Sequence, residues 1–182
     1  MAALEYLKLM AEYNQWMNDN IYRAAHHLDE HELSSDKGAY FKSIIGTLNH
    51  IMVGDIIWFQ RVANSFRNNK ALDFIRSLSK PNTLDEIIFD SIEELTNQRK
   101  KIDMSIIAFV DELNGSDLAK PLAFQNMKGI PFVKTTGLLM LHIFNHQTHH
   151  RGQISTLFSQ LGIDIGVTDL LYKIPDINET DI

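Results

Sequence analysis

Four histidines lie within nine residues near the C-terminal end of the sequence, at His142, His146, His149 and His150. Successive residues of an α-helix are rotated by about 100°, and the surrounding apolar residues mark the core face of this segment. His150 lies at the centre of that face and His146 close beside it, whereas the other two lie towards its flank. Two imidazoles spaced four residues apart can reach one metal ion from successive turns. Spacing and orientation therefore predict His146 and His150 as a pair of metal ligands.

Either inward histidine, taken alone, is also explained as a core residue satisfied by hydrogen bonds, because a buried imidazole needs partners for its nitrogen atoms. The pair together favours a metal ion, and a third ligand is then expected from another helix. His50 is the candidate, since it lies in a very apolar segment between Gly46 and Gly54. Glycine inside a helix costs about 1 kcal/mol relative to alanine. The two glycines indicate either room for a ligand or close helix packing, and both interpretations stay open.

Three neutral imidazoles leave a coordination position for water or substrate, as in catalytic rather than structural sites. One divalent ion, zinc, nickel or iron(II), fits such ligands. The chain has no cysteine, so it offers no thiolate ligand and no thiol nucleophile of its own. Gln147 stands where the H-E-x-x-H motif of metalloproteases has its glutamate, which argues against that mechanism.

Length and charge restrict the class of protein. A chain of 182 residues suits one domain spanning residues 1–182, and the net charge of −6 argues against nucleic acid as a partner. No apolar run reaches the roughly 20 residues that a bilayer span needs, so no membrane partner is expected. The first 22 residues have the pattern of a helix rather than a signal peptide, so we expect a cytoplasmic protein.

Apolar periodicity predicts the elements that must position the histidines. Long helices are expected at about residues 3–28, 40–62, 84–113 and 135–161. Thr83 and Glu86 resemble a capping box before the third helix, and Gly162 stops the fourth. A connection with a short helical turn is expected at residues 64–80. A hairpin or irregular excursion is expected at 118–134, and a frayed tail from about 176. The prediction is an all-α, antiparallel four-helix bundle.

The second helix is apolar nearly all round, which indicates a central position in the bundle or a subunit interface.

Three separated motifs resemble the signatures of the DinB/YfiT-like family. They are Asn145 to Gln153 (NHQTHHRGQ), Leu48 to His50 with the following Gly54, Asp55 and Trp58, and Tyr13 to Asn18 (YNQWMN). The match covers essentially the whole chain. The resemblance implies a four-helix bundle, often a homodimer, with a three-histidine metal site. Residue by residue, it implies His50, His146 and His150 as the ligands, in agreement with the helix angles.

The resemblance constrains the site better than the reaction. Some family members are metal-dependent transferases that use a low-molecular-weight thiol, and others are isomerases or have no assigned activity. The leading hypothesis is an enzyme that activates such a thiol for a small-molecule substrate, and the nearest variant is a metal-dependent hydrolase that activates water. The alternative is a non-enzymatic metal-binding protein of the stress response or a structural one.

The sequence also predicts roles for five further residues. Trp16 and Trp58 are interpreted as core anchors, with substrate lining as the alternative. Asp55 faces away from His50 around its helix and is expected to make a structural hydrogen bond. Arg151 points off the core face, which favours a salt bridge between helices or subunits. Gln153 faces inward and either supports a ligand or makes a packing hydrogen bond.

Overall fold

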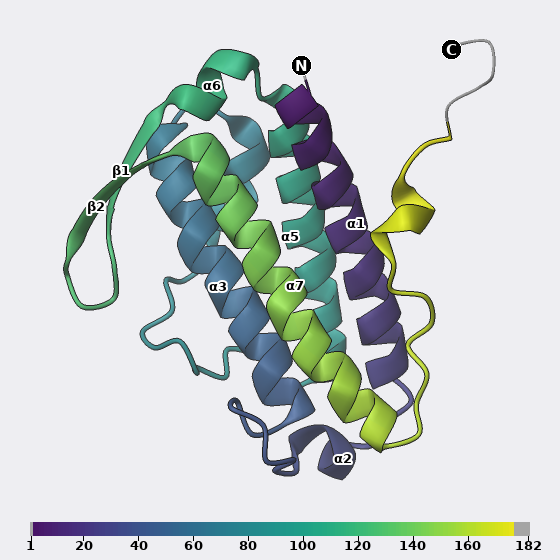
Figure 1. The fold of residues 1–182 in the computed structure, drawn as a ribbon. Coiled ribbons are helices and arrows are strands. Elements are labelled where there is room, and N and C mark those ends of the chain that lie inside the picture. The colour runs from purple at the N-terminus through teal and green to yellow at the C-terminus, as the bar shows by residue number, and fades with distance from the viewer. Residues whose placement is uncertain (1, 177–182) are drawn as a thin grey trace.

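Four long α-helices dominate the computed structural model, which describes residues 2–176 (Figure 1). They are α1 (Ala2–Ala25), α3 (Ile44–Ser65), α5 (Ile92–Glu112) and α7 (Thr136–Gln160). Their buried apolar side chains form a shared core, and the expected all-α four-helix bundle is confirmed. The tail predicted to fray lies, beyond residue 176, outside the described residues.

Contacts near the helix ends give the direction of the helices. Lys8 Nζ lies 2.9 Å from Asp111 Oδ1, so the start of α1 meets the end of α5 and the two helices run antiparallel. Helices α3 and α7 also run antiparallel (Figure 1). Near the start of α3, the Asn49 side chain accepts hydrogen bonds from the backbone N–H groups of Ile88 and Phe89, just before α5. The connection after α3 therefore carries the chain back along the bundle, and α3 and α5 run parallel.

Helix α3 begins at Ile44, four residues beyond the start expected at residue 40. The Ser43 side chain caps it by accepting a hydrogen bond from the backbone N–H of Gly46 at 3.0 Å. Seventeen of the 22 residues of α3 are buried within this chain. Its apolar surface is therefore explained by a central position in the bundle. None of the helices in the described part of the chain is both long and apolar enough to cross a membrane.

Helix α5 begins at Ile92, so the predicted start near residue 84 is wrong. The cap is Ser91, whose side chain accepts from the Glu94 backbone N–H at 3.3 Å. The predicted capping box forms only in part, since Glu86 accepts a long hydrogen bond from the Thr83 N–H (3.4 Å) and no helix follows. Contacts with α3 hold this stretch in a non-helical conformation.

Short elements fill the connections. The helical turn expected between residues 64 and 80 is present as η1 (Lys70–Leu72) and α4 (Asp73–Ser77). The others are α2 (Glu30–Ser34), α6 (Gly115–Ala119) and η2 (Leu170–Lys173).

The excursion before α7 is a two-stranded antiparallel hairpin of β1 (Pro121–Gln125) and β2 (Pro131–Thr135). Its turn depends on Gly129, which adopts a left-handed φ of 77°, and on Asn126, whose side chain accepts from the Lys128 backbone N–H at 2.9 Å. The hairpin projects beside α3 and α7 (Figure 1). It thus walls one side of the region where the histidines of these two helices meet.

Candidate metal centre

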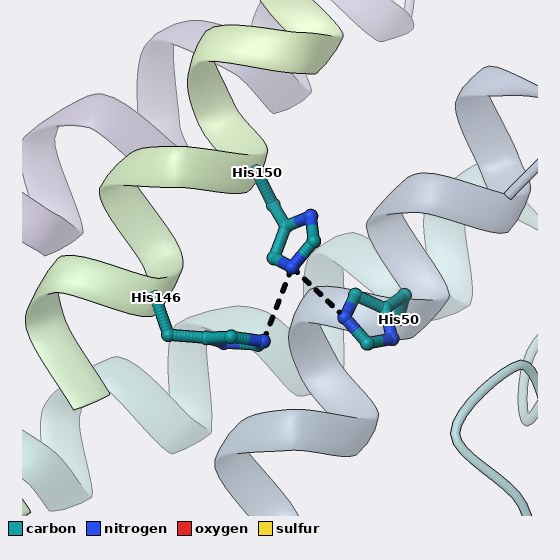
Figure 2. A group of neighbouring side chains, drawn as sticks. All are labelled: His50, His146 and His150. Carbon is teal, nitrogen blue, oxygen red and sulfur yellow. Dashed lines mark hydrogen bonds between the residues drawn. The ribbon is translucent and has the colours of Figure 1, made fainter. Parts of the chain in front are cut away.

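Three histidines converge between α3 and α7, and we call His50, His146 and His150 the histidine centre. His146 and His150 extend from successive turns of α7 towards His50 on α3 (Figure 2). The Nε2 atom of His150 lies 3.0 Å from Nε2 of His50 and 3.1 Å from Nε2 of His146. The possible ligand atoms all lie within 4.8 Å of one another. The structure therefore brings together the three residues that the sequence singled out.

The spacing of these nitrogen atoms suits one ion. Metal–nitrogen bonds of about 2.0–2.1 Å place two ligand nitrogens about 2.9 Å apart at a right angle and about 3.4 Å apart in a tetrahedron. The observed separations of 3.0 and 3.1 Å fall between these values. The cluster can hold a metal ion.

Hydrogen bonds on the far side of two rings determine where the protons lie. His50 Nδ1 is 2.7 Å from the Leu84 carbonyl oxygen, which can only accept, so this nitrogen carries the hydrogen. His150 Nδ1 likewise donates to Gln153 Oε1 at 2.7 Å. In the neutral rings both Nε2 atoms then present lone pairs to each other across 3.0 Å. Such an arrangement is repulsive unless a cation lies between the two nitrogens.

A proton is a poor candidate for that cation. Burial lowers the pKa of all three imidazoles from the ordinary value of 6.5. For His146, burial and the neighbouring histidines together lower the pKa to about 3. The three rings are therefore neutral near pH 7, which is the protonation state that metal binding requires.

The two glycines beside His50 serve close packing. A Cβ atom at Gly54 would lie 3.0 Å from His146 Cε1, so this glycine makes room for the His146 imidazole. A Cβ atom at Gly46 would collide with the Phe41 carbonyl oxygen. The Phe41 ring in turn stacks on His50 at a centroid distance of 3.7 Å. The structure shows close packing at Gly46, whereas Gly54 both packs against the His146 ring and lines a cavity beside His50.

A cavity of about 330 Å³ adjoins the histidine centre, with His50 and His146 in its wall. Its other lining includes apolar side chains from α3, the hairpin turn and the segment before α5, with His142 at one side: Ile57, Trp58, Leu84 and Met127. Trp58 is only half-buried and packs edge-on against His142 at 5.0 Å. Trp58 therefore packs against the core, as expected, and also lines the cavity. Trp16 is half-buried as well, on α1.

A second buried polar group lies next to the histidine centre, and we call Asp55, Arg99 and Asp103 the ion-pair network. Arg99 is 2% exposed, and its guanidinium lies 2.5 Å from Asp55 and 2.9 Å from Asp103. Asp55 also accepts a hydrogen bond from Gln147. Asp55 therefore makes the structural contact expected of it and is not among the converging ligand atoms.

Two expectations about α7 are wrong. Arg151 is 3% exposed and donates a hydrogen bond to Asn14 of α1, so it lies inside the bundle rather than off its core face. The reason is that α7 packs against both α1 and α3, whereas the helix angles were calculated for one core direction. Within residues 2–176 Arg151 forms no salt bridge, contrary to the expectation. Gln153 is exposed rather than inward. It nevertheless accepts a hydrogen bond from His150 Nδ1, which is the contact expected of a residue that supports a ligand.

Several site residues escaped the sequence analysis. The Leu84 carbonyl and the Phe41 ring touch His50 from loops, and no sequence pattern marks either contact. Arg61 of α3 also lines the cavity. The Arg99 and Asp103 pair had a detectable signal, since opposite charges four residues apart lie on one helix face.

Comparisons with known proteins agree with this fold. The model of the DinB family matches residues 2–180. Protein DinB of Bacillus subtilis (strain 168) is 28% identical over 158 residues, covering 87% of each chain. The crystal structure of a DinB-like protein from Bacillus cereus ATCC 10987 has a TM-score of 0.57 at 20% identity, over 91% of this chain and 94% of that one. This structural likeness concerns the fold alone.

Proposed function

This chain belongs to the DinB family, and from that premise we propose that it is a metal-dependent enzyme whose ion is held by the histidine centre. One observation carries the proposal. The Nε2 lone pairs of His50 and His150 face each other at 3.0 Å, while their Nδ1 atoms donate outward to Leu84 and Gln153. Histidine ligands of metals are oriented by hydrogen bonds of this kind. The donor set is nitrogen only, which suits zinc, nickel or iron(II).

We propose that the enzyme transfers a group of its substrate to a low-molecular-weight thiol. This thiol must come from outside, because the chain has no cysteine. A divalent ion at an open position would lower the pKa of such a thiol, or of water in the hydrolytic variant. The thiol sulfur would form a bond to an electrophilic carbon of a small-molecule substrate as the bond to the leaving group breaks. The adjoining cavity would seat that substrate against His50 and His146, and exposed His142 at its wall can accept the thiol proton.

The first test is metal content. Purified protein is expected to bind about one zinc, nickel or iron(II) ion per chain. His50→Ala and the His146→Ala, His150→Ala double variant should lose it. His149→Ala is the matched control, because His149 is an exposed neighbour on the same helix. Full metal content in either ligand variant would contradict the assignment of the site.

The second test is turnover. Loaded protein is screened with several thiols against an activated aryl halide, and with an ester for the hydrolytic variant. Metal-dependent thioether formation that disappears in the ligand variants supports the transferase, whereas ester cleavage alone favours the hydrolase. Stoichiometric metal without turnover of any pair favours a non-enzymatic metal-binding protein.

We also propose a homodimer, on the family resemblance. The apolar surface of α3 does not support a dimer, because the other segments of the same chain bury this surface. The remaining apolar surface includes Leu138 and Leu141 of α7 and Val133 of β2, which are 57–68% exposed. Light scattering of the intact chain and of Leu141→Glu is the test. A monomeric wild type would contradict the proposal.

A further inference from the structure

The surroundings of the cavity differ in charge from the rest of the molecule. The chain has 23 acidic and 17 basic residues. A second cavity of about 560 Å³ adjoins the first and shares with it the lining residues Ile57, Arg61, Asn126 and Met127. Neither lining includes an aspartate or glutamate, but together they include Arg61, Lys80 and Lys128. In an acidic protein, this concentration of cations beside the histidine centre indicates an anionic ligand.

Arg61 is the best-positioned of these cations. Its guanidinium lies 4.6 Å from the Trp58 ring centroid and 5.0 Å from that of Phe124, which fixes it between α3 and the hairpin. One of its nitrogens donates to the Gln125 carbonyl oxygen at 2.8 Å. A guanidinium has five N–H donors. Within residues 2–176 Arg61 has no carboxylate partner, so donors remain for a ligand.

Partial burial adds to the tendency of Arg61 to bind an anion. Arg61 is half-buried, and burial lowers the pKa of its guanidinium. A cation that has lost part of its hydration without gaining a counter-ion is stabilised when an anion arrives. By contrast, Arg99 in the bundle interior already has two carboxylate partners. Arg61 is therefore suited to a charge that comes from outside the chain.

We propose that Arg61, with Lys128 on the hairpin turn, binds the anionic group of the substrate. The chemical class is a small molecule with an apolar body and a carboxylate or phosphate-type group. The apolar body would lie against Trp58 and Leu84, and the anion at Arg61, while its reactive end meets the histidine centre. This inference rests on the proposed function, because it names the substrate class of the same site.

The test uses probes without a thiol, so that it does not depend on transferase activity. Zinc-loaded full-length protein is titrated by ligand-observed NMR with phenylacetate, its neutral analogue phenylacetamide, and benzylphosphonate. Wild type is expected to bind phenylacetate about tenfold more tightly than phenylacetamide, which is the size of one charge-assisted hydrogen-bonded pair. The order of phenylacetate and benzylphosphonate identifies which anion the site favours.

Arg61→Gln should reduce the preference for the anion to about twofold or less, with unchanged zinc content. Arg67→Gln is the matched control: it removes the same charge from an exposed position just beyond α3, outside both cavities, and should keep the preference. Lys128→Gln, on the exposed turn, should weaken it by about twofold. It also provides a second variant in case Arg61→Gln disturbs the hairpin.

A preference that persists in Arg61→Gln and Lys128→Gln would overturn the inference, because the anion would then be binding elsewhere, for example on the zinc. Equal binding of phenylacetate and phenylacetamide by wild type would overturn it as well. If wild type bound no zinc, the proposed function would fail. The anion preference and its loss in Arg61→Gln can still be measured in the same samples, so the two failures are distinguishable.

Discussion

The histidine centre and the ion-pair network are neighbouring buried polar groups, but they are satisfied in different ways. In the network, the guanidinium of Arg99 pairs with two buried carboxylates, so its charged groups have partners within the chain. The histidine centre has three neutral rings whose inward nitrogen atoms face one another. The network has its counter-charges within the chain, whereas the histidine centre can hold a metal ion. The comparison therefore distinguishes a group with internal partners from one suited to a ligand from outside.

The two groups are also connected. Gln147 lies between the ligand pair in sequence, and its side chain bonds Asp55 of the network. Asp55 lies on α3 one residue after Gly54, which accommodates the His146 ring. The network thus fixes the relative position of α3 and α7 where the histidines must meet. We expect it to act as a rigid support for the histidine centre.

The largest effect is expected from breaking the network. Asp55→Ala leaves Arg99 with an uncompensated share of buried charge, which costs about 3–5 kcal/mol of unfolding free energy. Denaturant unfolding of the metal-free protein measures it. Lys8→Ala is the control, because it breaks the exposed Lys8–Asp111 pair and should cost less than about 1 kcal/mol. Equal costs for the two variants would remove the distinction between buried and exposed pairs.

A substitution in the histidine centre should have little effect on the stability of the metal-free protein and should instead remove its stabilisation by zinc. His150→Gln is expected to cost the metal-free protein less than about 1.5 kcal/mol, since it removes a repulsive lone pair together with a hydrogen bond. Zinc at 100 times its dissociation constant should stabilise wild type by about 2.7 kcal/mol and leave the variant nearly unchanged. Unfolding curves with and without zinc measure both. A loss comparable to that of Asp55→Ala in the absence of zinc would show that the centre is structural.

A smaller effect is expected at Gly54. A Cβ atom there would press on the His146 ring at 3.0 Å and displace it from the other ligands. We expect Gly54→Ala to weaken zinc binding by about tenfold. Gly152→Ala is the control on α7, because nothing lies within 4 Å of its added Cβ atom. Competition with a chromophoric chelator measures both affinities, and equal affinities would contradict the packing role of Gly54.

A further effect concerns pH. The pKa of His146 is about 3 in the folded chain against an ordinary value of 6.5. Between these values the unfolded chain binds more protons, so the metal-free protein should lose stability as pH falls below about 6.5. His146→Gln should reduce this loss. Thermal midpoints at about pH 5 and pH 7.5 measure the difference, and an identical pH slope in both proteins would argue against a neutral His146.

Helical periodicity explains why so much of the histidine centre was predictable. The direction of a side chain on a long helix follows from its position, so His146 and His150 could be selected among four histidines. A single core direction does not place Arg151 correctly, because α7 is covered by α1 as well as by α3. The start of α5 was misplaced because Asn49 holds the preceding stretch from another helix. Contacts between distant segments leave no periodic signal, and Arg61 beside the hairpin is another such case.

Anomalous diffraction from a zinc-soaked crystal tests the central claim most directly. We expect a single strong anomalous peak within about 2.0–2.2 Å of the Nε2 atoms of His50, His146 and His150. The Nδ1 atoms of His50 and His150 should keep their bonds to Leu84 and Gln153. Absence of a peak there, with zinc bound elsewhere in the chain, would contradict the assignment of the histidine centre as the metal site.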